Sequence, residues 1–119
     1  MIFEYKHDAE FFTPERCHII ELLNQATDER CSIARARVEP GITTQLHALS
    51  NTEERYVILN GEGLVEVDGG PPIAVHPMDV VHIPTGVSQR ITNTTSKDLI
   101  FLAICTPRFR PEVYENLEA

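Results

Sequence analysis

Clusters of turn-forming residues recur at short, fairly regular intervals along this chain, and they constrain its fold more than any other feature. Glycine supplies positive φ angles, proline fixes φ, and Asn or Asp bonds its own backbone, so each cluster predicts a turn for a physical reason. The clusters lie at residues 39–41, 50–52, 60–63, 68–72, 76–79, 84–86 and 93–96. A chain interrupted this often is typical of a sandwich or barrel of short strands.

The segments between these turns are rich in residues that favour strands. They lie at residues 30–38, 55–59, 64–67, 73–75, 80–83, 90–92 and 99–105. We therefore expect an all-β fold. Because Asn60-Gly61 lies between two of these segments, it also predicts a β-hairpin.

The secondary structure of the two ends of the chain is less clearly predicted. Thr13-Pro14-Glu15 has the pattern of a helix start, and the apolar residues of 19–23 fit a helical stripe as well as a strand. Helix and strand therefore both stay open for this segment. The C-terminal residues 111–117 are expected to form one or two helical turns at most.

Composition limits the partners and the compartment. The chain has 119 residues, 42% of them hydrophobic, and a formal net charge of −8. This length predicts a single folded domain, and the acidic balance argues against nucleic acid or an anionic membrane as a partner. The first residues contain no apolar stretch typical of a secretory signal, so we expect a cytoplasmic protein. Cys17, Cys31 and Cys105 have no metal-binding or redox spacing and are interpreted as small packing residues.

Two spaced motifs carry the most specific information. The first reads Pro40-Gly41-x5-His47-x-Leu49-x4-Glu54-x6-Gly61, and the second reads Met78-Asp79-x4-Pro84-x-Gly86-x2-Gln89-x3-Asn93. In this order, joined by the segment 58–67, they resemble the two motifs of the cupin superfamily over about residues 30–106. The resemblance is to small single-domain cupins of the conserved-barrel (cupin 2) type.

This resemblance implies a jelly-roll barrel, also called a double-stranded β-helix. It implies one cupin domain over residues 1–119, in which residues 30–106 form the barrel and residues 1–29 add strands or an arm for a dimer. Similar proteins often pair as homodimers, so a homodimer is expected here. The resemblance also favours strand over helix for residues 17–23.

In cupins that bind a metal, the motif histidines and the glutamate are the ligands. His47 and Glu54 match this pattern, but Leu49 and Gln89 stand where two further histidines belong. Leucine ligates no metal, and Gln89 offers only a neutral amide oxygen. The candidate metal ligands are therefore His47, Glu54 and Gln89, for a divalent ion such as Fe, Mn, Ni or Zn.

Strand periodicity supports one shared site. Side chains two apart on a strand face the same way, so Gln45 and His47 share a face, as do Glu54 and Tyr56. With Gln89 from a third strand, these residues are predicted to line a pocket with apolar walls, which is typical of a small-molecule site. His82 alternates with the apolar residues beside it and is expected to face away from this pocket.

Three functions are compatible with these residues, so the sequence does not decide whether the chain is an enzyme. The first is a metal-dependent enzyme, such as a dioxygenase, isomerase or decarboxylase, that acts on a small oxygenated substrate and uses His47 and Glu54 as catalytic residues. The second is a ligand-binding or sensor cupin without catalysis, in which Gln45, Tyr56 and Gln89 contact the ligand. The third is a metal-free sugar isomerase or epimerase with His47 as its general base.

Overall fold

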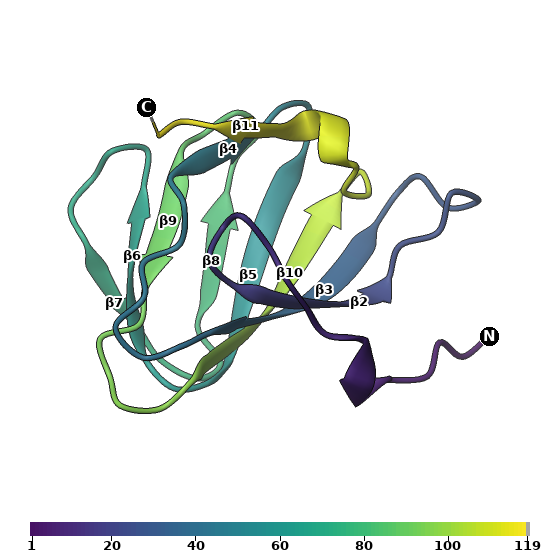
Figure 1. The fold of residues 1–119 in the computed structure, drawn as a ribbon. Helices are drawn as coiled ribbons and strands as arrows, with labels where there is room; N and C mark the ends of the chain where they lie inside the picture. The colour runs from purple at the N-terminus through teal and green to yellow at the C-terminus, as the bar shows by residue number, and fades with distance from the viewer. Residues whose placement is uncertain (119) are drawn as a thin grey trace.

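The computed structural model describes residues 1–118, which form two β-sheets that face each other (Figure 1). The elements are η1(His7–Ala9), β1(Phe11–Phe12), β2(His18–Leu23), β3(Ser32–Val38), β4(His47–Leu49), β5(Glu53–Asn60), β6(Gly63–Val67), β7(Ile73–Val75), β8(Val80–Ile83), β9(Gln89–Thr92), β10(Leu99–Thr106), η2(Pro111–Val113) and β11(Tyr114–Asn116). One sheet has the strand order β1-β2-β3-β10-β5-β8, and the other has the order β11-β4-β9-β6-β7. The expected all-β jelly-roll is confirmed.

Alternation along the strands builds the core between the sheets. On β5 the even-numbered residues Glu54, Tyr56 and Ile58 are buried, while their odd-numbered neighbours are partly exposed. The antiparallel pairing of β5 with β10 and of β10 with β3 carries this alternation across the sheet. The result is a continuous apolar layer that includes Val38 and Ile91.

The segment after Thr13-Pro14-Glu15 is a strand, so the helical alternative is wrong there. Residues 14–17 form a turn, and His18–Leu23 then pairs antiparallel with β3. Burial alternates weakly here, with Ile20 buried and Glu21 exposed. Pairing with β3 satisfies the backbone of a segment whose local sequence does not choose between helix and strand.

The Asn60-Gly61 turn is not the predicted hairpin. Strand β5 pairs with β10 and β8, whereas β6 pairs with β7 and β9, so residues 61–62 carry the chain from one sheet to the other. Gly61 has φ of +81°, and a Cβ there would lie 2.7 Å from the carbonyl oxygen of Asp98. The glycine is therefore required by a crossing between sheets.

The two ends of the chain each add a strand to the edge of a different sheet. Strands β1 and β2 extend the six-stranded sheet, and the single 3₁₀ turn η2 leads into β11, which pairs with β4 (Figure 1). The predicted C-terminal helical turn is thus present but short. Within residues 1–118, we find no helix that is long and apolar enough to cross a membrane.

Candidate functional site

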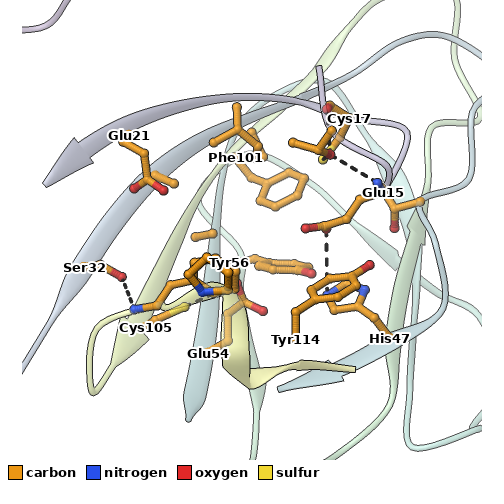
Figure 2. A pocket seen from close by; sticks show the side chains of 18 of the residues that line it. Glu15, Cys17, Glu21, Ser32, His47, Glu54, Tyr56, Phe101, Cys105 and Tyr114 are labelled. Atoms are coloured by element: carbon orange, nitrogen blue, oxygen red, sulfur yellow. Dashed lines mark hydrogen bonds and ion pairs between the residues drawn. The ribbon is translucent and has the colours of Figure 1, made fainter. Parts of the chain in front are cut away.

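A cavity of about 320 Å³ lies between the two sheets. Inward-facing side chains of β2, β3, β5 and β10 form one wall, and His47 of β4 and Tyr114 of β11 form the other. The turn before β2 contributes Glu15, as Figure 2 shows. The cavity is thus lined by segments from the whole length of the chain.

Small side chains create this space. The inward positions of β3 carry Ser32, Ala34 and Ala36, and β10 contributes Ala103 and Cys105 beside them. Larger side chains at these positions would fill the space between the sheets, as they do elsewhere in a close-packed core. The cavity is therefore encoded by a patch of short side chains on two neighbouring strands.

His47 is buried in the cavity wall, with 3% of its surface exposed. Its Nδ1 lies 2.7 Å from the carbonyl oxygen of Gln45. Because a carbonyl only accepts, Nδ1 carries a hydrogen, which leaves Nε2 as the atom with a variable proton. Nε2 lies 3.9 Å from a carboxylate oxygen of Glu15, and the imidazole stacks on the ring of Tyr114 at 4.9 Å between centroids (Figure 2).

Glu54 is the most deeply buried carboxyl group of the cavity. Its Oε2 accepts a weak hydrogen bond from the Cys105 thiol at 3.6 Å, and its Oε1 has no partner among the described residues. Burial raises the pKa of Glu54 to about 7; the Gln89 amide opposes this effect, and the charge of Glu15 adds to it. A carboxyl group that titrates near neutral pH in a cavity is typical of functional sites.

Gln89 lies behind the cavity wall. It is fully buried on β9 opposite His47, and its Oε1 accepts the hydroxyl proton of Tyr56. Tyr56 itself lines the cavity, and burial holds its pKa well above the ordinary value. The Tyr56–Gln89 pair therefore presents a neutral ring surface to the cavity.

Gln45 supports the site from outside the cavity. Its backbone carbonyl orients His47, and its side-chain Oε1 accepts the hydroxyl proton of Tyr114 at 2.5 Å. Of the five residues predicted to line the pocket, the structure brings His47, Glu54 and Tyr56 to the cavity surface, with Gln45 and Gln89 behind them. His82 faces outward, as expected, and its Nε2 lies 2.7 Å from Glu53.

Glu15, Glu21 and Tyr114 also line the cavity, although the sequence did not single them out. Burial raises the pKa of Glu15, which the nearby His47 opposes, and burial also raises the pKa of Glu21. These residues lie outside both motifs. Their place in the site follows from the way β2 and β11 pack at the edges of the two sheets, for which local sequence carries no signal.

The donor set does not fit a resident metal ion. Leu49 packs in an apolar cluster with Cys105 and Val113, and the amide oxygen of Gln89 is engaged by Tyr56. Only His47 and Glu54 remain from the four motif positions, fewer than the usual set for a bound transition metal. Residues 1–118 contain no group of three or more His, Cys, Asp or Glu side chains arranged to hold a metal.

Comparisons with known proteins agree with this architecture. The chain is 38% identical over 71 residues to an oxalate-binding protein of Thermotoga maritima, a match that covers 60% of this chain and 58% of that protein. It is 32% identical over 117 residues to the uncharacterized protein MJ1618 of Methanocaldococcus jannaschii, which covers 97% of this chain and 93% of the relative.

A solved structure described as a "predicted oxalate decarboxylase" from Thermotoga maritima superposes with a TM-score of 0.71 at 31% identity. This match covers 76% of this chain and 80% of that one. The Cupin_2 family model, described as a cupin domain, matches residues 34–105, which include all the strands that bear the two motifs. The chain therefore belongs to the Cupin_2 family of cupin-domain proteins.

Proposed function

We propose that this cupin binds a small molecule in its cavity and transfers a proton to or from it without a resident metal ion. The observation that carries this proposal is Glu54, a buried carboxyl group with one oxygen unpartnered among residues 1–118. Its pKa of about 7 allows it to hold or release a proton at neutral pH. An isomerase, an epimerase and an eliminating enzyme all need such a group.

His47 supplies the second proton-transfer group. The hydrogen bond from Nδ1 to Gln45 fixes the ring, so Nε2 is the atom that accepts or donates a proton. Glu15, 3.9 Å from Nε2, stabilises the imidazolium form when the ring is protonated. Two proton-transfer groups around one cavity form the acid–base pair that proton transfer between substrate atoms requires.

The walls of the cavity support this role. Phe101 and the ring of Tyr56 are apolar surfaces beside Glu54, and their ring centroids are 4.4 Å apart. Apolar walls exclude water and strengthen the electrostatic interactions of the few polar groups that remain. Cys17 and Cys105 are poor nucleophiles here, because burial raises the pKa of the Cys17 thiol to about 12 and raises that of Cys105 further.

Two other functions are tested by the same experiments. A metal-dependent enzyme would use His47 and Glu54, with Glu15 replacing the engaged Gln89, and the relative named for oxalate binding motivates this alternative. A binding module without catalysis would use the same cavity. Both stand below acid–base chemistry, because the first lacks donors and the second does not require a carboxyl group that titrates near neutral pH.

Deuterium exchange at carbon tests the proposal across many candidate substrates at once. The protein is incubated in D₂O with a panel of sugars, amino sugars and keto acids, and proton NMR follows exchange at carbon. We expect wild-type protein to catalyse exchange in at least one compound and Glu54→Gln or His47→Gln to slow it by about 100-fold or more. The control Glu62→Gln, in an exposed turn, should retain the wild-type rate.

Two results would contradict the proposal. Ligand-induced stabilisation with no exchange or turnover in any compound would leave only the binding module. Stoichiometric metal in protein purified without tags or chelators, lost in His47→Gln, would establish the metal-dependent alternative instead.

A further inference from the structure

The charged side chains that line the cavity have one sign. Glu15, Glu21 and Glu54 contribute three carboxyl groups, and none of the lining side chains in the described part of the chain is Lys or Arg (Figure 2). His47 is the one lining group that can take a positive charge. With the imidazole neutral, the cavity carries up to three negative charges when its carboxyls ionise.

The arginines nearest to the cavity are engaged elsewhere. Arg35 and Arg37 lie on β3 between the inward positions, and both contact Glu10 on the outer face of the sheet. Arg16 follows Glu15 in the turn, yet its guanidinium forms a bidentate ion pair with Glu118 and donates to the Thr43 carbonyl. Among the lining side chains of residues 1–118, only His47 could balance a bound anion, and only when its imidazole is protonated.

The rest of the lining suits a compact cation. Five aromatic residues also line the cavity: Phe11, Tyr56, Phe101, Phe109 and Tyr114. Aromatic faces attract organic cations, and this attraction increases when the site excludes water. Behind this surface, the buried Oε1 of Glu54 has no hydrogen-bond partner among residues 1–118.

We propose that the ligand of this cavity is a small organic cation, a protonated amine on a compact, partly apolar body. The proposal rests on the proposed function, because it names the substrate class of the same site. The ammonium group would lie beside the carboxylates of Glu15 and Glu54, with the exposed Glu21 farther away in the lining, and the apolar body would pack against the aromatic rings. An oxalate dianion would instead meet charges of its own sign.

The affinity for this ligand class should depend on pH, because the carboxyl groups of the cavity can be protonated. Burial raises the pKa of all three carboxyl groups, so they keep protons to higher pH than exposed carboxyls do. A bound ammonium group favours their ionised forms, so binding should release protons and strengthen as pH rises towards about 8. A neutral ligand would lack this coupling.

Three ligands of nearly equal size provide the test: benzylamine, benzyl alcohol and benzoate. Isothermal titration calorimetry at about pH 8 compares them, with oxalate as a fourth ligand. We expect benzylamine to bind at least about tenfold more tightly than benzyl alcohol, and benzoate and oxalate to bind more weakly than either. At about pH 6 the preference for benzylamine should decrease.

Substitutions test which carboxyl groups cause the preference for benzylamine. Glu15→Gln and Glu54→Gln should each reduce the preference for benzylamine over benzyl alcohol by about tenfold, and the exposed control Glu62→Gln should keep it. Glutamine is isosteric with a protonated carboxyl, and circular dichroism verifies that each variant is folded. Glu15 lies in a turn and is only partly buried, so its variant keeps the test valid if Glu54→Gln fails to fold.

Any result in which benzylamine does not bind more tightly than the other three overturns the inference. A preference for benzylamine that survives in both glutamine variants overturns it as well. These outcomes differ from failure of the proposed function, because tight binding of benzoate together with carbon-bound deuterium exchange would refute the cation and leave acid–base chemistry in place. Tight binding of benzylamine without deuterium exchange would instead leave a cation-binding module without catalysis.

Discussion

Replacement of Glu54 by glutamine should change how the stability of the protein depends on pH. In the folded protein the pKa of Glu54 is about 7, against an ordinary value of 4.5, so the folded state holds this proton more tightly than the unfolded state. Its contribution to stability is therefore complete below about pH 4.5 and is lost as pH rises to about 7. At about 1.36 kcal/mol for each pH unit between the two values, the loss amounts to about 3 kcal/mol.

Glutamine at position 54 keeps the shape of the protonated carboxyl but does not ionise. The free energy of unfolding of wild-type protein should thus fall by about 3 kcal/mol more than that of Glu54→Gln between about pH 4.5 and pH 8. In a domain of this size that difference corresponds to about 10 °C in Tm. Glu21 also has a raised pKa, but its effect is present in both proteins and cancels in the difference, whereas the charge of Glu15 is one cause of the raised pKa of Glu54 and is included in the value above.

Urea denaturation followed by circular dichroism at a series of pH values measures this difference. The control Glu62→Gln alters an exposed turn and should reproduce the wild-type curve. If wild type and Glu54→Gln instead give parallel curves of stability against pH, the carboxyl of Glu54 does not titrate near neutral pH. Glu54 would then be unable to serve as the acid–base group of the cavity.

Other features of the structure can be tested one at a time. Gly61→Ala should cost about 1–3 kcal/mol of unfolding free energy beyond Gly41→Ala in urea denaturation, because both glycines have positive φ but only a Cβ at Gly61 meets backbone. Ala34→Leu fills the cavity and should abolish ligand-induced shifts in Tm while the fold is retained by circular dichroism. Glu118→Gln loses one side of the ion pair with Arg16 and should speed amide hydrogen exchange in β11 but not in β5; equal rates would contradict this. The homodimer stays a prediction, to be tested by sedimentation, and a monomer mass of 13.4 kDa would refute it.

Much of the fold could be predicted because its determinants are local. Turn residues at fairly regular intervals delimited seven strands to within about two residues, and alternation assigned Glu54 and Tyr56 to one inward face and His82 to the outside. Local sequence could not specify which strands pair with one another. Asn60-Gly61 has the pattern of a hairpin turn, but β5 pairs with β8 and β10, which lie far away in the sequence, and the chain crosses between the sheets at Gly61.

The candidate site was predicted only in part, for the same reason. His47 and Glu54 were found because they occupy motif positions, and the cavity indeed lies beside them. Glu15, in the turn before β2, and Tyr114, on β11, reach His47 from opposite ends of the chain, through contacts that have no signature in the sequence. Glu15 changes the chemistry of the site, because it adds a negative charge beside the imidazole of His47. The two motif positions that would carry further histidines hold Leu49 and Gln89 instead.

The two departures from the cupin motif have a joint electrostatic consequence. With leucine at position 49, that corner of the site is apolar, and with glutamine at position 89, the Tyr56 hydroxyl has a neutral acceptor. Neither residue brings a positive charge or a metal to the carboxyl of Glu54, so burial dominates its ionisation and keeps its proton to about pH 7. The absence of ligating side chains at positions 49 and 89 and the proton that Glu54 keeps to near neutral pH are thus linked.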